Sequence, residues 1–570
     1  MLILILSSSL IMAQEATSEE EAAAAKALAE KKQATRQIQE LEIETAWIIP
    51  DDSSKKLEDT SFPELNWKKP EIAKTAFADT TLSPRWFDKD LNEVTKPEKP
   101  GRYTAYIEKD LLNGTKFRRF ITIYAYDNSN GMWWDKVSNS VNTSKIDFKY
   151  MPFDLINKKT WEQQSSFVSE SVKGQIWDFM WSKNGALMLS SLSEIEPIKA
   201  KKVSKQIDNM ETRNQDYNLA LKMKVLNITP KKLELPKKVK EKSTTLRKGT
   251  LAEAGISEKG IEKIRQACKD WQKGTENGFT VCIVRNGVIA FYEAFPGKKD
   301  KEAIGEKVTL NTKFPTASVT KLHAGLLLAQ FIDQGLINLD DPAGKYLPDF
   351  PTTGDKVITV RQLMNHNTGL DGHGNFGGMN NPFLETDEMI GIEFLHPGLR
   401  SLYNGMGIDL TGKIMEVVSG KSIFRLFQEN FFTPIGQDNP DIHDLGYGLN
   451  CTVMDLARVT QMMLNKGSYG NTVFFSPETF DKLTPIPANT YSPNAIKSDD
   501  VTWIYGVGMM PATYGTQGYK GLNHGSATAT SMLADMERNV AICMSRYTPE
   551  GHEKYWGNFY NAIADAIIVR

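Results

Sequence analysis

Ser318 and Lys321 are the residues whose types and spacing most directly suggest chemistry. They lie three positions apart in PTASVTK and stand directly before the apolar run LHAGLLLAQF. A serine hydroxyl is a poor nucleophile at neutral pH unless a base accepts its proton. A lysine is such a base only when burial or a nearby cation lowers its pKa enough to leave it neutral. The pair therefore predicts a nucleophile and its base, on condition that the fold buries the lysine.

The spacing by itself does not separate a catalytic pair from a coincidence. Ser53 and Lys56 have the same spacing within DDSSKKLED, a polar stretch that no apolar helix follows. Ser318 instead opens a segment whose apolar residues predict a buried helix. On such a helix, residues three positions apart lie on the same face, so Lys321 is expected next to the serine.

The elements that position this pair lie in the C-terminal part of the chain, residues 249–570. The run SEKGIEKIRQACKDWQKG predicts a helix, FTVCIVRNGVIAFYEAF predicts strands, and HGSATATSMLADMERNVAICMSRY predicts a closing pair of strands. All seven histidines lie between His323 and His552. We therefore expect the chemistry in this part of the chain.

Six blocks of this part stand in an order that resembles the serine β-lactamase-like family. They are PTASVTKLHAGLLLAQFIDQGLINLDDPAGKYLPDF, ITVRQLMNHNTGL, PGLRSLYNGMGIDLTGKIMEVVSG, ENFFTPIG, GLNCTVMDLARVTQMMLNKG and HGSATATSMLADMERNVAICM. The family includes class C β-lactamases, family VIII carboxylesterases, D-aminopeptidases and penicillin-binding DD-peptidases. The resemblance covers about residues 250–570 and implies an α+β fold, in which helices flank a central antiparallel sheet and form a second, helical subdomain.

The resemblance also implies roles for individual residues. Ser318 matches the acylated serine and Lys321 the adjacent base. The family's Tyr-x-Asn motif aligns on Tyr403, Asn404 and Gly405. Tyr403 is then a third catalytic residue, whereas Gly405 replaces the motif asparagine. Asn404, which stands one position early, is expected among the substrate-binding residues. That asparagine helps to bind the amide side chain of the substrate in the family, so its loss favours an acyl ester over a β-lactam or a peptide.

A third motif, Lys-Thr-Gly or His-x-Gly in the family, matches His524, Gly525 and Ser526 in part. His524 is expected to replace the lysine that pairs with a substrate carboxylate, although a histidine is only partly charged near neutral pH. The same alignment implies an oxyanion hole made of the backbone N–H groups of Ser318 and Ala527.

Structural interpretations of the same residues stay open. Tyr403 is also compatible with a place in the core, and His524 with the cap of a turn. His323 lies two positions after the lysine and is expected to pack in the core. His366, in LMNHNTGL, is expected to order a loop.

The residues before 249 divide into four expected parts. An apolar stretch over residues 1–13 predicts a signal peptide, and hence a periplasmic or secreted protein. No basic residue precedes Lys26, so a mis-assigned start or a cytoplasmic protein is the alternative. Residues 14–45 predict a charged helical tether, 46–200 a β-rich module of unknown role, and 201–248 a basic linker.

Composition limits the partners. Lysine and arginine number 68 against 70 aspartate and glutamate residues, a net charge of −2, which points neither to nucleic acid nor to a polybasic membrane anchor. The apolar stretch is too short for a membrane span. The four cysteines form no CxxC pair, so we expect no metal site, no cofactor and no disulfide framework. Eight of the eleven tryptophans lie between Trp47 and Trp181, which suggests either a β-module core or contact with carbohydrate or cell wall.

The sequence thus predicts a serine hydrolase that works through an acyl-enzyme, with a small ester or amide as substrate. One alternative is a DD-peptidase or D-aminopeptidase that acts on cell-wall peptides. Another is a binding protein that retains the fold without catalysis. The substrate and the oligomeric state are not determined by these patterns.

Overall fold

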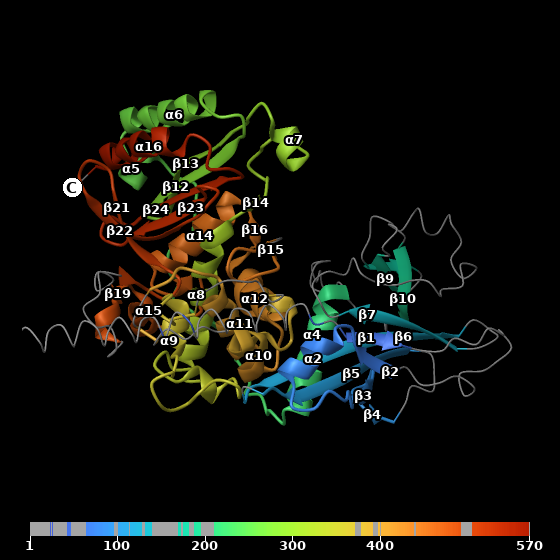
Figure 1. Cartoon of the computed structure of the whole chain (residues 1–570). Helices are drawn as coiled ribbons and strands as arrows, with labels where there is room; N and C mark the ends of the chain where they lie inside the picture. The colour runs from blue at the N-terminus through green and yellow to red at the C-terminus, as the bar shows by residue number, and fades with distance from the viewer. Residues whose placement is uncertain are drawn as a thin grey trace, which may run out of the picture. The chain divides into compact units, whose positions relative to one another are not determined.

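The structure is a computed structural model, shown in Figure 1. It describes residues 23, 26, 41, 43–46, 64–95, 101–112, 114–127, 132–138, 169–172, 175–181, 187–194, 210–370, 378–391, 397–398, 401–437, 440–491 and 504–568. The expected signal peptide and nearly all of the expected tether lie outside these residues. The chain forms two compact units: an N-terminal unit of residues 1–198, 373–377 and 381–395, and a C-terminal unit of residues 199–372, 378–380 and 396–570.

The N-terminal unit is built mainly from antiparallel strands. Its largest sheet has five strands in the order β4-β3-β5-β6-β7, and a second sheet has the order β10-β9-β8. The elements are β1 (Ile43–Ala46), β2 (Glu64–Trp67), α2 (Pro70–Ala76), β3 (Arg85–Asp88), β4 (Glu93–Val94), β5 (Gly101–Asp110), β6 (Lys116–Asp127), β7 (Met132–Ser138), β8 (Ser169–Val172), β9 (Gln175–Trp181), β10 (Leu187–Glu194) and, later in the chain, α10 (Leu384–Gly391).

Aromatic side chains form much of the core of this unit. Trp86 is 3% exposed and packs with Tyr103 and other apolar residues of the five-stranded sheet. Trp67 stacks on Phe77 with 4.6 Å between the ring centroids. These two tryptophans are therefore core residues, and the expected carbohydrate contact would need the tryptophans whose side chains are not described.

The helices of the C-terminal unit are α4 (Met210–Val225), α5 (Leu251–Ala254), α6 (Glu258–Lys273), α7 (Asp300–Ile304), η3 (Ala317–Val319), α8 (Thr320–Asp333), η4 (Ala343–Lys345), α9 (Val360–Met364), η5 (Gly378–Asn380), α11 (Met406–Ser419), α12 (Ile423–Phe427), η6 (Gln428–Phe432), α13 (Thr433–Ile435), α14 (Val453–Leu464), α15 (Pro477–Leu483), η7 (Ala488–Thr490) and α16 (His552–Ala566). Its strands are β11 (Lys237–Lys238), β12 (Phe279–Arg285), β13 (Val288–Phe295), β14 (Phe314–Pro315), β15 (Asp441–Ile442), β16 (Leu449–Cys451), β17 (Ser468–Tyr469), β18 (Thr472–Val473), β19 (Ile486–Pro487), β20 (Ile504–Tyr505), β21 (Met510–Tyr514), β22 (Tyr519–Gly525), β23 (Ser531–Asp535) and β24 (Val540–Arg546).

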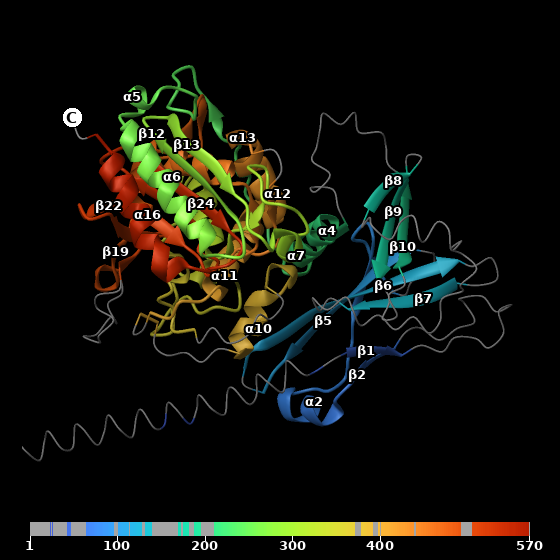
Figure 2. The ribbon, with the colours of Figure 1, turned by 90° about the horizontal axis from the view of Figure 1, so that it is seen from above.

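A six-stranded antiparallel sheet, β13-β12-β24-β23-β22-β21, forms the centre of the C-terminal unit. Successive side chains of a strand point to opposite faces. Ile542 and Met544 of β24 accordingly join the cluster under α6 and α16, which lie side by side on one face (Figures 1 and 2). Between them, Cys543 faces the other way and contacts Thr460 of α14 at 3.2 Å. Helices thus cover both faces of the sheet, which confirms the predicted fold class.

Helix α8 is the buried helix that the sequence predicts after the serine. Its residues from Thr320 to Phe331 are all buried, so little of the helix faces solvent. Gly325 has no room for a side chain, because a Cβ there would overlap the carbonyl oxygen of Val507. The close approach fixes α8 against the segment that precedes β21.

Residues 210–248, where we expect a basic linker, pack on the C-terminal unit. Asp216 of α4 accepts a hydrogen bond from Ser422 at 2.7 Å and pairs with Arg425. Lys231 donates its backbone N–H to Val418, and β11 pairs with β18. This stretch therefore belongs to the C-terminal unit, although the domain boundaries otherwise stay a prediction.

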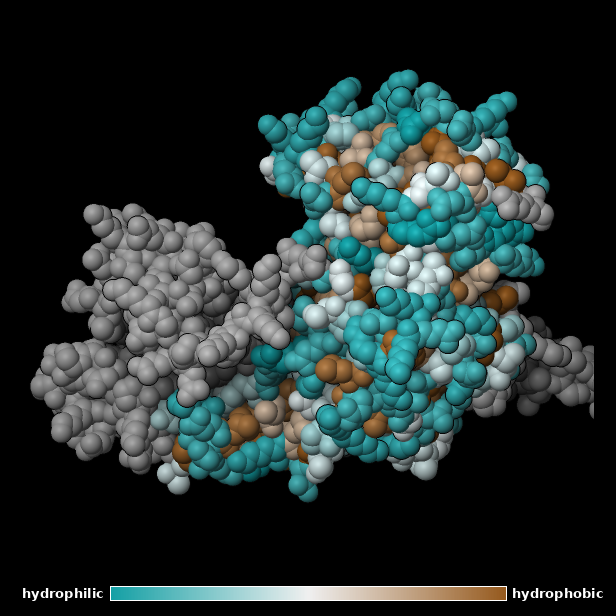
Figure 3. Space-filling view, turned by 180° about the vertical axis from the view of Figure 1, so that it is seen from behind, coloured by the Kyte–Doolittle hydropathy of each residue, from teal (hydrophilic) through white to brown (hydrophobic). Residues whose placement is uncertain are grey.

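No helix among the described residues combines the length and the apolar character that a membrane span requires. Figure 3 shows one face of the molecule on which hydrophobic residues lie scattered among hydrophilic ones. The four cysteines are all free and buried, where a thiol packs as a small apolar group.

Candidate active site

The turn that carries Ser318 is held in an unusual backbone conformation. Ala317, just before the serine, has a φ of 45°, in the left-handed region that residues with a Cβ rarely adopt. The Thr320 hydroxyl donates to the Ala317 carbonyl at 2.6 Å and accepts the backbone N–H of Leu449 at 3.1 Å. Positive φ in such a residue costs free energy, and the surrounding contacts must compensate for it.

Lys321 lies beside Ser318, as the spacing predicts. Its Nζ is 3.4 Å from the Ser318 Oγ, and the residue is only 3% exposed. Nζ also donates to the carbonyl oxygen of Gly446 at 2.6 Å. Burial lowers the pKa of Lys321 to about 8, and the nearby carboxyl groups of Asp409 and Asp444 oppose this shift. A substantial fraction of the lysine is therefore neutral near physiological pH.

Tyr403 completes this group of side chains. Its ring centroid is 4.8 Å from the Lys321 Nζ. Burial raises the pKa of the Tyr403 hydroxyl, and a hydrogen bond with the Ser318 side chain opposes the shift. The residue is nevertheless 43% exposed. The structure thus brings the three predicted catalytic residues together.

His366 orders the segment that carries Tyr403. It has a φ of 59°, its carbonyl accepts the N–H of Leu402 at 2.8 Å, and its Nδ1 accepts the N–H of Asn404 at 3.4 Å. Its ring lies 4.4 Å from that of Tyr403. This agrees with the expected loop-ordering role. His323 is fully buried with its ring 5.9 Å from that of Phe431, as expected for a packing residue.

His524 lies inside the protein and not at the open side of the site. It is 1% exposed, its Nδ1 lies 2.6 Å from the Gly525 carbonyl oxygen, and its Nε2 lies 2.7 Å from the Tyr505 hydroxyl. Because a carbonyl only accepts, Nδ1 carries the proton, and in the neutral ring Nε2 accepts from Tyr505. Burial lowers the pKa of His524 to about 4. A neutral ring with both nitrogens occupied gives no support to the predicted pairing with a substrate carboxylate.

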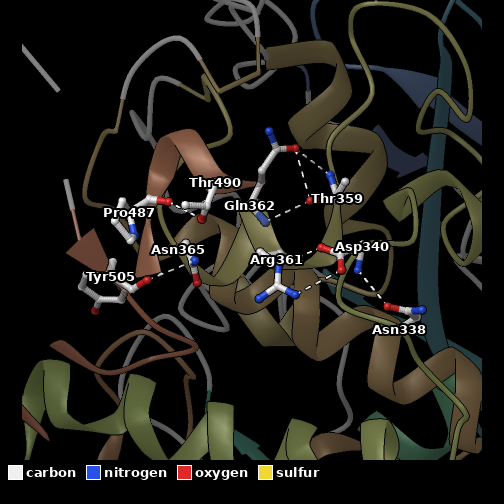
Figure 4. Close-up of polar contacts among 9 residues, drawn as sticks. All are labelled: Asn338, Asp340, Thr359, Arg361, Gln362, Asn365, Pro487, Thr490 and Tyr505. Carbon is white, nitrogen blue, oxygen red and sulfur yellow. Dashed lines mark hydrogen bonds and ion pairs between the residues drawn. The ribbon is translucent and has the colours of Figure 1, made fainter. Parts of the chain in front are cut away.

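Helix α9 helps to place Tyr505, as Figure 4 shows. Asn365, which follows the helix, donates its side-chain amide to the Tyr505 carbonyl at 3.2 Å. At the other end of α9, Thr359 and Gln362 form a reciprocal capping box. Neighbouring Arg361 pairs with Asp340 at 2.7 Å. These contacts fix the helix, and with it the partner of His524.

Asn404 and Gly405 form the start of α11. The Asn404 side chain accepts the N–H of Met406 at 3.1 Å and donates to the Leu402 carbonyl at 2.9 Å. It therefore caps the helix, and its predicted contact with substrate stays a prediction. Gly405 has a φ of −84° that any residue adopts, and a Cβ there would meet only the Gly446 Cα, at 3.7 Å.

The predicted oxyanion-hole residues lie on two neighbouring segments. Strand β22 ends at Gly525 and contacts the short helix η3 that holds Ser318. Ala527, in the turn after β22, is exposed. The Ser526 hydroxyl is 2.9 Å from that of Thr528, within the same turn. Binding of an oxyanion by the backbone of Ser318 and Ala527 stays a prediction that this arrangement accommodates.

Three residues at the site were not found from the sequence: Asp409, Asp444 and Gly446. The last two lie in DLGYG, just before a block of the family resemblance, and Asp409 lies within the Tyr403 block. Gly446 acts through its carbonyl, and a backbone group carries no side-chain signal in a sequence. Within the described part of the chain, no three His, Cys, Asp or Glu side chains come together as metal ligands would.

The C-terminal unit thus combines a central antiparallel sheet, covered by helices, with a serine hydroxyl beside a buried lysine. The Beta-lactamase family matches residues 264–554, just over half of the chain, and the chain belongs to this family of hydrolases.

Among curated proteins, the chain is 33% identical over 176 residues to the "Teichoic acid D-alanine hydrolase" of Staphylococcus aureus. The matched stretch covers 30% of this chain and 42% of that protein. The match therefore spans less than half of the relative. Among solved structures, a putative beta-lactamase from Bacteroides dorei DSM 17855 has a TM-score of 0.45 and 22% identity, and covers 55% of this chain and 99% of its own. A family VIII carboxylesterase has the same TM-score and coverage with 18% identity.

Proposed function

We propose that the protein is a serine hydrolase that cleaves small acyl esters or amides through an acyl-enzyme. The observation that carries the proposal is the buried Lys321 Nζ, 3.4 Å from the Ser318 Oγ, with a pKa lowered to about 8. A lysine in this state accepts a proton, and a serine beside it becomes a nucleophile.

The proposed reaction has two halves. Ser318 Oγ attacks the carbonyl carbon while its proton passes to Lys321, and the negative charge on the carbonyl oxygen is stabilised by the N–H groups of Ser318 and Ala527. The bond to the leaving group then breaks as Tyr403 donates its proton to the leaving group, and the proton that Lys321 took from the serine passes to Tyr403. Water attacks the acyl-enzyme next and gives its proton to the lysine and tyrosine pair. As the acyl bond breaks, the pair returns this proton to the Ser318 Oγ, and the free acid is released.

The charges of the site favour a substrate without an obligatory carboxylate. Lys321 donates to the Gly446 carbonyl, and His524 is buried with a pKa lowered to about 4. Neither is placed as a free cation. This supports an ester or amide hydrolase over a DD-peptidase, whose substrate ends in a carboxylate. A D-alanyl ester belongs to the favoured class, and the name of the curated relative makes it a substrate to test.

Export of the protein, and contact of its N-terminal unit with cell wall or carbohydrate, complete the proposal. The apolar stretch at residues 1–13 is the basis for export, and sequencing the N-terminus of the protein from separated cell fractions tests export. A mature protein that keeps these residues and stays with the cytoplasmic fraction would contradict export.

The test of catalysis is labelling with a fluorophosphonate followed by mass spectrometry. We expect one adduct, on Ser318, that S318A abolishes and that K321A reduces almost as strongly, because members of one catalytic unit are not additive. The matched control is S257A, since Ser257 also opens a helix and accepts the Gly260 N–H at 3.0 Å, but a glycine stands three positions after it, where Lys321 follows Ser318. S257A should keep full labelling.

Two results would contradict the proposal. One is the absence of any adduct between about pH 6 and 9, a range that includes a lowered lysine pKa. The other is K321A with most of the wild-type rate. A panel of p-nitrophenyl esters, D-amino acid amides, D-alanyl esters and a chromogenic cephalosporin then identifies the substrate class, and a rapid, stable penicillin adduct would favour the cell-wall peptidase.

A further inference from the structure

Two buried carboxyl groups hold the turn that contacts the lysine. Asp444 Oδ1 accepts the backbone N–H of Gly446 at 2.7 Å and that of Tyr447 at 3.1 Å. Asp409, from the first turn of α11, accepts the N–H of Leu445 at 3.2 Å. The N–H groups of three consecutive residues therefore end on two carboxyl groups, and the carbonyl of the middle residue accepts Lys321.

These two carboxyl groups are buried and interact electrostatically, so ionising both costs free energy. Asp409 is 8% exposed and Asp444 5%. Burial raises the pKa of each, and the charge of Asp444 raises that of Asp409 further. Two carboxyl groups in such a place hold one proton between them over a wide pH range.

The hydrogen bonds indicate which group keeps the proton. Asp444 accepts two backbone N–H groups, which stabilise a carboxylate, whereas Asp409 accepts one. The other charged or titratable groups that bear on the pair are Lys321, Lys413 and His443. Lys413 is already engaged by Glu416 at 3.0 Å and by the Met379 carbonyl. When it is protonated, Lys321 is thus a buried cation that faces one negative charge shared by Asp409 and Asp444.

We propose that Asp409 and Asp444 are positioning residues that share a single negative charge beside Lys321, with the proton on Asp409, and that hold the turn whose Gly446 carbonyl accepts the lysine. The pair limits how far burial lowers the proton affinity of the lysine, and it fixes Nζ within reach of the Ser318 hydroxyl. This inference rests on the proposed function, in which Lys321 must lose its proton before it acts as the base.

A shared charge makes a distinctive prediction for substitution. In D409N or D444N one carboxyl group remains and carries the charge alone, so the charge beside Lys321 does not change. Asparagine keeps an oxygen that accepts the backbone N–H groups. In D409N/D444N the charge is gone, the lysine loses its proton more easily, and activity should extend to lower pH.

The experiment is the pH dependence of the fluorophosphonate labelling rate and of kcat/KM for an ester. We expect the acid-side midpoint of D409N and D444N to stay near that of the wild type, and that of the double variant to fall by about one pH unit or more. D300N is the control. Asp300 is 3% exposed and accepts three backbone N–H groups, those of Gly278, Gly297 and Val308. It is not among the groups that shift the pKa of Lys321. Single variants that each shift the midpoint by half the double's shift would overturn the shared charge. A double variant without a shift would overturn the link to the lysine.

A second measurement separates this inference from the proposed function. Carbon-13 spectra of protein labelled at the aspartate carboxyl group report protonation without any catalysis. The resonance that D409N removes should be that of a protonated carboxyl group at pH 7, and the one that D444N removes that of a carboxylate. If wild-type protein never labels, the function fails, yet these spectra still decide the inference. Two carboxylate resonances at pH 7 would overturn the shared charge. If the double variant does not fold, the comparison of D409N with the wild type still decides this point.

Discussion

At the scale of single residues, the environment of Lys321 determines what Ser318 can do. Burial favours the neutral lysine, whereas the carboxyl groups of Asp409 and Asp444 favour the charged one. The balance places the pKa at about 8, close to the range in which a general base is most effective. A lysine with its ordinary pKa would remain protonated at neutral pH and would not activate the serine.

Gly405 is the residue that separates this site from the family's Tyr-x-Asn motif, and G405N tests its role. The position has ordinary helical dihedrals and room for a Cβ, so we expect the free energy of unfolding to change by no more than a few tenths of a kcal/mol. If the missing amide limits recognition, turnover of a chromogenic cephalosporin should rise while ester cleavage persists. G405A is the control, because it adds the Cβ without the amide. Equal cephalosporin turnover in G405N and G405A would show that the asparagine is not the selectivity element.

At the scale of elements, the site depends on how closely α8 approaches the segment around Val507. Both sides of this contact are glycines: a Cβ on Gly325 would overlap the Val507 carbonyl oxygen, and one on Gly508 would overlap the Lys321 carbonyl oxygen. Backbone therefore packs on backbone next to the turn that carries Ser318. Such a contact positions the serine and lysine more firmly than flexible side chains would.

The substitution G325A should separate this contact from helix propensity. Alanine favours a helix over glycine by roughly 1 kcal/mol, but the overlap with Val507 forces α8 to move, and overpacking of this kind costs about 1–3 kcal/mol. We expect a net loss of stability in urea unfolding and slower fluorophosphonate labelling. G557A, in α16, is the matched control, since its Cβ would meet no atom within 4 Å, and it should be stabilised. A G325A protein as stable as G557A would contradict the close approach.

At the scale of the whole molecule, the chain passes between its two units more than once. Residues 381–395 lie in the sequence between α9 and α11, yet they belong to the N-terminal unit. Within that unit, α10 packs on β6. The ring of Phe383, just before α10, has its centroid 4.7 Å from that of Phe120. Arg119 pairs with the buried Asp387 at 2.7 Å. The segment that leads toward Tyr403 is therefore anchored in the N-terminal unit.

The ion pair offers a test of this anchor. Burial raises the pKa of Asp387, and Arg119 opposes the shift, so R119A should raise it further. An aspartate whose pKa is raised by folding destabilises the protein above its unfolded pKa, and this effect disappears as the pH falls and both states become protonated. R119A should thus cost about 1–3 kcal/mol near pH 7 in urea unfolding, less than a fully buried pair because Arg119 is 27% exposed, and the cost should shrink in acid.

The control for this test is R119A/D387N, which removes the buried charge. The double variant should recover part of the stability that R119A loses near neutral pH. Its stability difference from the wild type should no longer shrink as the pH falls. An R119A protein with wild-type stability at all pH values would contradict the anchor.

Much of the C-terminal fold could be predicted from the sequence. The apolar run after Ser318 predicts the buried helix α8, apolar runs such as FTVCIVRNG predict strands, and the ordered blocks indicate the family and, through it, the central antiparallel sheet. Local pattern is sufficient here because burial and periodicity are properties of neighbouring residues. Local spacing and the apolar run likewise identify Ser318 and Lys321 as candidates, whereas Tyr403 is identified only through the family resemblance.

Only the tertiary structure decided the chemical state of the site. Contacts between segments far apart in the chain bury Lys321, place Asp409 and Asp444 beside it, supply the Gly446 carbonyl and enclose His524 as a neutral ring. The packing of residues 210–248 on the C-terminal unit and of α10 in the N-terminal unit is likewise invisible to local pattern. A pKa and a hydrogen-bond partner depend on distance in space, and distance along the chain does not determine them.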